Sequence, residues 1–395
     1  MPAPDVQDVL DGVDLRPADL PGLIAELRVR LADEVAAVGD ERDAVPVIDY
    51  DDIVRGRVPD GTHDAVRRRA CVVVRNTFER QQAEEWDREL ADYLQRNRFE
   101  ERYAALQPER AATGSRIWGI YWSRPQVEAR QHDRMATVRR FLNGFWRHES
   151  EGTTWFDPAH DIGYPDRVRR RAPGVESRGL LPHVDSVARL GWREEENRRV
   201  FRHVFAGEPD RFDPWHAAHR TDPSSSADAP SAVFRTFQGW TALSEMRPED
   251  GGLHILPIPA AITLSMLDGL LRSVLADEPD GAPRARPDDA LLPALTPVPP
   301  VEPGDTVWWH GDLFHSVADA SSDERAGNVM YIGVAPRCAR NDAYVATMPE
   351  RFVTGRSPAD FPPEDHEVDF VGRASVSDLD GLGREQFGLE PIVRT

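Results

Sequence analysis

The sequence predicts a mainly β fold with flanking helices, which is an α+β fold rather than a regular α/β alternation. Short runs rich in Val, Ile, Phe and Trp recur through the middle of the chain, each bounded by Gly, Pro or Asp, and this pattern is typical of antiparallel strands. The runs do not alternate with helical patterns as βαβ units would require. With 395 residues, the chain is long enough to bury a large core.

Composition excludes several classes of function. The formal net charge of -20 makes nucleic acid and anionic membrane surfaces unexpected partners, because both favour a basic protein surface. All 48 basic residues are arginines, so Schiff-base chemistry, pyridoxal-phosphate attachment and a phosphate-loop lysine are excluded. The two cysteines, Cys71 and Cys338, are too few for a disulfide framework or a four-thiolate zinc site, and we expect both to be small buried residues.

No targeting or membrane segment is indicated. The N-terminal stretch lacks a basic start followed by an apolar core, and no run of 18 apolar residues occurs. We therefore expect a cytoplasmic protein whose partner is a small-molecule substrate. The sequence leaves the oligomeric state open.

The first half of the chain predicts helices around early strands. Residues 1–45 form a helical extension, and residues 71–75 (CVVVR) a buried strand. The segments QQAEEWDRELADYLQRN and VRRFLNGFWRHES have helical spacing, and SRIWGIYWSR between them predicts a strand. The apolar positions that define these helices are Leu20, Leu23, Ile24, Leu27, Leu31, Trp86, Leu90, Leu94, Phe141, Leu142, Phe145 and Trp146.

Three arginines alternate in the stretch YPDRVRRRAPG. On a strand, Arg167, Arg169 and Arg171 would project to the same side, where guanidinium groups could hold a carboxylate or phosphate. A solvated edge strand explains the same pattern equally well. We single out Arg169 and Arg171 as candidate substrate ligands.

A candidate metal site begins in the stretch LLPHVDS. His183 and Asp185 are two residues apart, so on a strand both side chains point to the same side of the sheet. A second histidine would come from PGDTVWWHGDLFHSV, which offers His310 and His315. Two imidazoles and one carboxylate with open positions are the ligand set of non-haem Fe(II) oxygenases.

The remainder of the chain predicts one domain with two insertions. Residues 46–345 form that domain, residues 193–230 read as a polar loop, and residues 268–300 as a helix followed by a long loop. Between the insertions, VFRTFQGWTALSEM predicts a strand in which Arg235 and Gln238 would need polar partners, such as a bound ligand. The acidic residues 346–395 show little periodicity and are expected to wrap the outside.

An ordered set of stretches carries a family resemblance. HVD, FQGWTALSEMRPEDGGLHILPIP and EPGDTVWWHGDLFHSV resemble the phytanoyl-CoA-hydroxylase-like Fe(II)/2-oxoglutarate dioxygenases. YPDRVRRRAPG, FRTFQGW and VMYIGVAPRC resemble more closely the DUF1479 (YbiU-like) family within that branch, and the resemblance covers about residues 65–345. It implies a double-stranded β-helix, a cupin-like jelly roll. It also implies that the iron ligands are His183, Asp185 and His315, with His310 as a competitor of His315.

The resemblance further implies the activity of a dioxygenase. Such an enzyme uses Fe(II), 2-oxoglutarate and O2, releases succinate and CO2, and hydroxylates or otherwise oxidises a C–H bond. The arginine-rich stretch at 167–171, rather than the resemblance, favours a small, carboxylate-bearing substrate such as an amino acid. A guanidinium suits the far carboxylate of 2-oxoglutarate because it donates two parallel hydrogen bonds. The spacing in relatives places that arginine at Arg325, with Arg337 and Arg235 as alternatives. Trp240 and Thr241 match co-substrate positions, and Gln238 joins Arg169 and Arg171 as a substrate candidate.

Two other hypotheses stay open. The first is a cupin-like metalloenzyme that does not use 2-oxoglutarate. The second is a catalytically silent jelly-roll protein that binds a small carboxylate. Succinate release in the presence of Fe(II) distinguishes both from the oxygenase.

Overall fold

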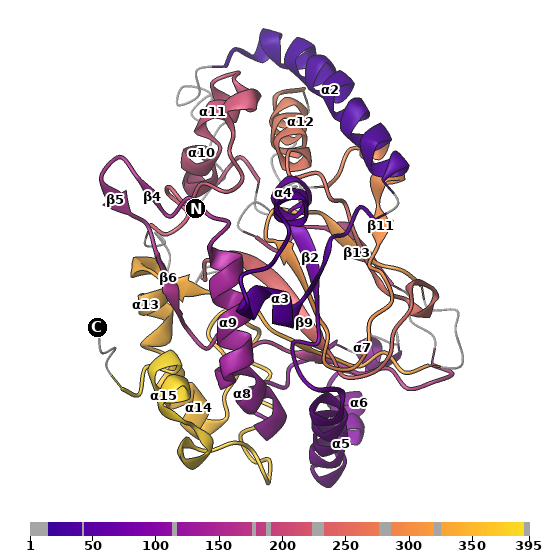
Figure 1. The fold of residues 1–395 in the computed structure, drawn as a ribbon, viewed down its shortest axis with the longest axis vertical. Helices are drawn as coiled ribbons and strands as arrows, with labels where there is room; N and C mark the ends of the chain where they lie inside the picture. Colours follow the sequence, from indigo (N-terminus) through magenta and orange to yellow (C-terminus); the bar gives the residue numbers. More distant parts are fainter. Residues whose placement is uncertain are drawn as a thin grey trace.

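The computed structural model has a mixed α+β architecture in which helices surround a large sheet, and this confirms the α+β part of the predicted fold class (Figure 1). Helices make up more of the described chain than the predicted mainly β fold implies, and the double-stranded β-helix stays a prediction. No described helix is long and apolar enough to cross a membrane. The structure describes residues 15–41, 43–112, 117–175, 179–186, 191–222, 233–275, 286–319 and 325–390.

The larger sheet has seven strands, and all neighbours are antiparallel except β1 and β2. Gly239 shows how closely its strands pack. A Cβ atom at Gly239 would lie 2.4 Å from Cε3 of Trp308 on the neighbouring strand, so this position excludes any side chain. The strands, in spatial order, are β1 (Val47–Asp49), β2 (Cys71–Arg75), β12 (Thr306–His310), β9 (Phe237–Ala242), β14 (Val329–Tyr331), β7 (Val168–Arg169) and β3 (Ile117–Trp118).

A smaller antiparallel sheet of four strands carries part of the candidate site. Its register places His315 directly opposite His183. The four residues between His310 and His315 carry the chain from the larger sheet to this one, so these two histidines belong to different sheets. In spatial order the strands are β11 (Thr296–Pro297), β10 (Leu253–Ile255), β13 (His315–Val317) and β8 (Leu180–His183). Two further two-stranded ladders pair β15 (Pro336–Arg337) with β6 (Asp157–Asp161) and β4 (Glu149–Ser150) with β5 (Thr153–Thr154).

The predicted amphipathic helices form largely as expected. In α2 (Leu20–Asp40), the predicted face is buried and packs against α12 (Ala261–Leu275), as Figure 1 shows in its upper part. The helix around residue 140 ends earlier than predicted, at Asn143, although the following Phe145 and Trp146 are buried. The remaining helices of the first half are α3 (Tyr50–Val54), α4 (Asp60–Arg69), α5 (Arg80–Arg96), α6 (Phe99–Leu106), α7 (Pro108–Ala112), α8 (Arg124–Gln131) and α9 (Asp133–Asn143).

The expectation of a polar loop over residues 193–230 is wrong for residues 195–205. Residues 195–205 form α10 (Glu195–Val200) and α11 (Arg202–Phe205). Phe201, Val204 and Phe205 are buried in the cluster that includes α2 and α12, and their spacing is that of one helical turn. Many arginines and glutamates surround these three residues in the sequence, so the apolar face was too short to be recognised from the pattern. Residues 223–232 lie outside the described part of the chain.

The C-terminal region contributes to the core. Residues 346–390 contain α14 (Met348–Thr354) and α15 (Gly381–Gln386), preceded by α13 (Ala339–Val345). Phe352 and Phe387 are buried in a third apolar cluster. The segment therefore packs into the core as well as covering the outside, whereas the domain boundaries at residues 45 and 345 stay predictions. The two cysteines are buried and free, as predicted.

Candidate metal centre and its cavity

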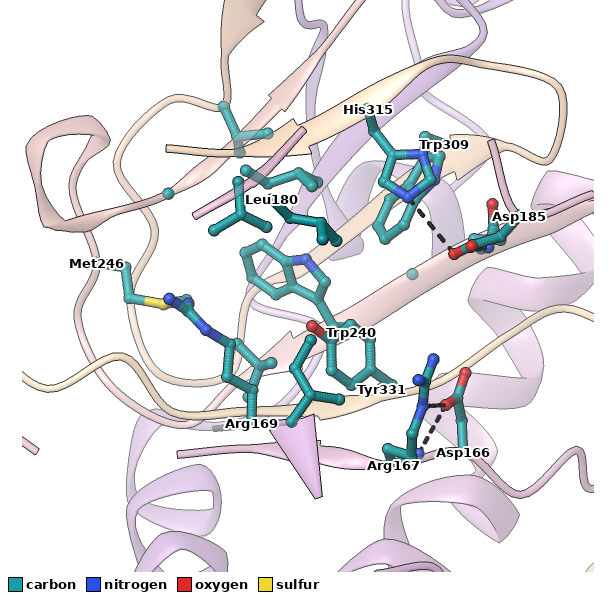
Figure 2. Close-up of a pocket in the computed structure, with 18 of the residues that line it drawn as sticks. Asp166, Arg167, Arg169, Leu180, Asp185, Trp240, Met246, Trp309, His315 and Tyr331 are labelled. Atoms are coloured by element: carbon teal, nitrogen blue, oxygen red, sulfur yellow. Dashed lines mark hydrogen bonds and ion pairs between the residues drawn. The ribbon is translucent and has the colours of Figure 1, made fainter. Parts of the chain in front are cut away.

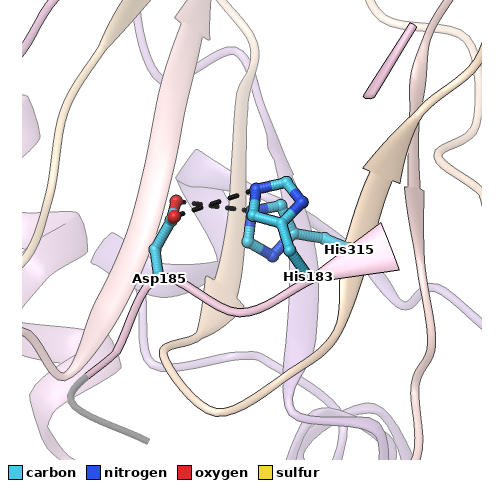
Figure 3. Close-up of side chains that lie close together, drawn as sticks. All are labelled: His183, Asp185 and His315. Atoms are coloured by element: carbon cyan, nitrogen blue, oxygen red, sulfur yellow. Dashed lines mark ion pairs between the residues drawn. The ribbon is translucent and has the colours of Figure 1, made fainter. Parts of the chain in front are cut away.

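Three side chains converge at one end of the smaller sheet. His183 ends β8, Asp185 follows two residues later, and His315 begins β13 opposite His183. Nε2 of His183 lies 3.7 Å from Oδ1 of Asp185, and Nε2 of His315 lies 3.5 Å from Oδ2 (Figure 3). One ligand atom from each residue lies within 4.8 Å of the others, so this group could hold one metal ion.

The hydrogen bonds of both imidazoles fit metal binding. Nδ1 of His183 lies 2.7 Å from the carbonyl oxygen of Leu181, and Nδ1 of His315 lies 3.2 Å from that of Leu313. A carbonyl only accepts, so Nδ1 carries the proton and the Nε2 lone pairs face Asp185. Burial and the neighbouring His315 lower the pKa of His183, which favours the neutral, metal-binding form.

Asp185 is held by residues of the larger sheet. Burial alone would raise the pKa of its carboxyl group, but the neighbouring His315 and His183, together with the guanidinium of Arg235, hold that pKa well below its usual range. Nε2 of Gln238 donates to Oδ2 of Asp185 at 3.1 Å, and Arg235 donates to its backbone carbonyl at 3.3 Å. Gln238, predicted as a substrate ligand, therefore contacts the candidate metal ligand Asp185.

A cavity of about 190 Å³ lies between the two sheets beside the trio. Strands β7, β9 and β14 of the larger sheet line it together with β8, β10 and β13 of the smaller one (Figure 2). Its wall is part apolar and part charged. The apolar members include Leu180, Trp240, Met246, Leu253, Val301 and Trp309, and the charged members include Asp166, Arg167, Arg169 and Arg235.

Arg169 brings a buried positive charge into this cavity. Its side chain projects toward Met246 in Figure 2, and only 9 % of the residue is exposed. Burial lowers the pKa of its guanidinium group. Nη2 donates to the carbonyl oxygen of Gly251 at 3.3 Å, and no carboxylate of the described residues lies within ion-pair distance. Such a guanidinium is poised to receive an anion from a ligand.

The structure brings together only some of the predicted ligand residues. Arg169, Arg235, Gln238 and Trp240 line the cavity with the trio, whereas Thr241 is buried in β9 away from it. Because β7 ends at Arg169, the alternation stops there. The predicted substrate ligand Arg171 instead donates to the backbone carbonyls of Asp250, Val175 and Arg325.

The arginine favoured for 2-oxoglutarate lies outside the cavity. Arg325 pairs with Asp250 at 2.8 Å and with Glu249 at 3.2 Å, and the alternative Arg337 pairs with Asp342 at 2.8 Å. Both guanidinium groups already have carboxylate partners. The spacing in relatives predicts only the position of this arginine along the chain. In the structure its side chain turns toward the acidic residues Glu249 and Asp250.

The cavity also contains residues that the sequence analysis did not select. Asp166 and Arg167 line it from the segment before β7, and Tyr331 lines it from β14. The alternation of Arg167 with Arg169 was the available signal for Arg167. No sequence pattern distinguished Tyr331 from an ordinary strand aromatic.

Comparisons with known proteins find relatives that align with this chain over most of their length. A family model described as Gig2-like matches residues 19–389. The uncharacterized protein YbiU of Escherichia coli (strain K12) is 42% identical over 380 residues, which cover 92% of this chain and 90% of the relative.

Solved structures show the same overall fold. The crystal structure of a putative oxidoreductase from Salmonella typhimurium LT2 is 38% identical, with 97% of this chain and 95% of that chain covered and a TM-score of 0.85. The GlcNAc-inducible gene 2 protein (GIG2, DUF1479) of Candida albicans is 23% identical, with coverage of 100% and 92% and a TM-score of 0.77, a likeness in fold alone.

Proposed function

We propose that this chain, which belongs to the Gig2-like family, is a non-haem Fe(II)- and 2-oxoglutarate-dependent oxygenase. It would oxidise a C–H bond of a small carboxylate-bearing molecule, for example an amino acid. The observation that carries the proposal is the convergence of His183, Asp185 and His315 at the wall of a cavity that also contains an arginine, Arg169, for which the described residues supply no carboxylate partner. Two largely antiparallel sheets that both line this cavity support a double-stranded β-helix.

The residues present fit iron. Imidazole and carboxylate ligands suit Fe(II), and two histidines with one carboxylate on one side leave positions open for other ligands. His183 and His315 would bind through Nε2, and Asp185 through a carboxylate oxygen that Gln238 orients. When bound, iron would supply the activation of O2 that is coupled to decarboxylation of 2-oxoglutarate, with release of succinate and CO2.

Arg169 is the residue that best suits the far carboxylate of 2-oxoglutarate. It replaces Arg325 in this role because Arg169 lines the cavity and has no carboxylate partner among the described residues, whereas Arg325 is paired at the surface. A guanidinium can donate two parallel hydrogen bonds to one carboxylate. The rings of Trp240 and Tyr331 line the cavity beside it and would exclude water from the bound chain of the co-substrate.

The test is the release of succinate from 2-oxoglutarate by the anaerobically iron-loaded protein after O2 is admitted. We expect succinate in the wild type and none in His315→Ala. Binding of iron and 2-oxoglutarate without any succinate, with or without a panel of small carboxylic acids, would favour the silent binding protein. Iron binding without 2-oxoglutarate binding would favour the metalloenzyme that uses no 2-oxoglutarate.

A further inference from the structure

We propose that Arg167, together with Asp166 and Arg235, forms a second anion site in the cavity that binds a single carboxylate of the substrate. The substrate would then be a monocarboxylate, bound separately from the co-substrate. This inference rests on the proposed function, because it assigns Arg169 to 2-oxoglutarate.

Arg167 is fixed in an orientation that presents its outer nitrogens to the cavity. Its backbone N–H and its Nε both donate to Oδ1 of Asp166, at 2.7 Å and 3.2 Å. Its guanidinium carbon lies 5.0 Å from the ring centre of Phe361 and 5.9 Å from that of Tyr331. Among the described residues, neither Nη atom has a hydrogen-bond partner, and 38 % of the side chain is exposed. Both Nη atoms, with four N–H groups between them, therefore remain for a ligand.

The carboxylate of Asp166 interacts with both Arg167 and Arg235. Oδ2 of the buried Asp166 lies 4.0 Å from Nη1 of Arg235. Arg235 is itself occupied, because it donates to the backbone carbonyl of Asp185 and lies over the ring of Tyr164 at 5.2 Å. The other carboxylate that the described lining contains, Asp185, is assigned to the metal, so the group of Arg167, Arg235 and Asp166 keeps one positive charge.

The charges of the cavity define how many anionic groups it can take. A divalent metal with the Asp185 carboxylate leaves one positive charge, and Arg169 provides a second. The two carboxylates of 2-oxoglutarate neutralise both. The remaining charge at Arg167 favours one more carboxylate, whereas a neutral substrate would leave it unpaired and a dicarboxylate would bring an anion without a partner.

The two arginines serve different ends of the cavity. Arg235 contacts both Asp166 and the backbone carbonyl of Asp185. The pair of Asp166 and Arg167 therefore lies on the side of the cavity where the candidate metal ligands are. Arg169 instead donates to Gly251, in the turn before β10. Figure 2 shows the same separation, with Arg167 near Asp185 and Arg169 near Met246. A substrate held at Arg167 would place its neighbouring carbon atoms toward the metal.

The experiment measures binding without turnover. Full-length protein is loaded with Mn(II) in place of Fe(II) and saturated with 2-oxoglutarate, and the NMR relaxation of added probe molecules is recorded. The probes are acetate, butyrate, phenylacetate and N-acetylglycine, each compared with its primary amide. We expect the best acid to bind the wild type roughly 10- to 100-fold more tightly than its amide, the range typical of hydrogen bonds to charged groups.

Matched variants test which arginine causes the preference for an acid over its amide. Arg167→Met should remove the preference for acid over amide, and Arg167→Lys should restore part of it. Arg169→Met should instead weaken 2-oxoglutarate binding. If Arg167→Met does not fold, as judged by circular dichroism, Arg167→Gln takes its place.

Two results would overturn this inference and leave the proposed function intact. They are equal binding of every acid and amide to wild-type protein that binds Mn(II) and 2-oxoglutarate, and a preference that survives in Arg167→Met. Failure of the wild type to bind Mn(II) or 2-oxoglutarate would instead contradict the proposed function itself.

Discussion

Two buried histidines, five residues apart in the chain but in different sheets, have opposite surroundings. Both ring nitrogens of His310 are used inside the protein, since Nε2 lies 3.0 Å from the carbonyl oxygen of Pro214 and Nδ1 accepts the backbone N–H of Asp312 at 3.0 Å. Its ring also stacks on Trp146 at 4.7 Å. In His315 only Nδ1 is used by the backbone, and Nε2 faces Asp185 and the cavity.

The same contrast holds for the charged residues around each histidine. Beside His310, Arg220 pairs with Asp312 at 2.7 Å, and Arg340 pairs with Glu196. Beside His315, the cavity contains Arg169 without a carboxylate partner among the described residues. The comparison shows that the region around His310 is complete without a ligand, whereas the region around His315 offers donors and acceptors to one. We regard the first as structural and the second as the binding site.

The largest expected difference between the two regions is in metal binding. His315→Ala should weaken Fe(II) or Mn(II) binding by more than the roughly 100-fold that is the upper range for residues outside the ligand set. His310→Gln should keep the metal, because its ring is committed to Pro214 and Asp312. Metal content after anaerobic loading and desalting measures both. Metal loss in His310→Gln with retention in His315→Ala would reverse the assignment.

The second prediction concerns stability. Asp312→Ala should lower the free energy of unfolding by about 3–5 kcal/mol, because the buried guanidinium of Arg220 would lose its partner. Urea unfolding of the metal-free protein measures the change. The double variant Asp312→Leu with Arg220→Met should recover much of the loss, since it removes both charges. A loss below 1 kcal/mol in Asp312→Ala would show that the pair does little for stability.

A third prediction uses pH. Burial lowers the pKa of His310 to about 4, while Asp312 and Asp213 raise it and Arg220 lowers it. The unfolded residue titrates near 6.5, so the unfolded chain takes up the proton first as the pH falls. The stability that the neutral ring contributes is therefore full above pH 6.5 and is lost as the pH falls toward 4.

The variant His310→Gln isolates this effect. The stability difference between wild type and variant should shrink by about 2 kcal/mol between pH 7 and pH 5. Urea unfolding at both values measures it. Other histidines titrate in both proteins and cancel in the difference. A difference that does not change with pH would mean that His310 is not held in its neutral form.

The smallest effect on metal binding is expected from a residue that contacts a candidate metal ligand without binding the metal itself. Gln238→Leu removes the hydrogen bond to Oδ2 of Asp185 and should weaken metal binding by about tenfold, the lower range for a residue that orients a ligand. Thr241→Val in the same strand is the control, because Thr241 does not line the cavity. Titration with Mn(II) compares them. Equal affinities in both variants would show that Asp185 does not depend on Gln238 for its orientation.

The sequence alone determined the features that depend on local pattern. The amphipathic face of α2 and the buried strand β2 follow from side-chain spacing. His183 and Asp185 could be paired because residues two apart near one strand share a side. The order of motifs identified the family that the comparisons confirm.

The tertiary structure decided everything that depends on partners distant in sequence. The family resemblance favoured His315 over His310, and the positions of Pro214, Trp146 and Asp185 supply the physical reason for that choice. Likewise the sequence favoured Arg325 as the anchor of 2-oxoglutarate and offered Arg169 only as a substrate ligand, yet an acidic turn neutralises Arg325 and not Arg169. The physical reason is that a buried charged group needs a partner, and the fold decides whether that partner is another residue or a ligand.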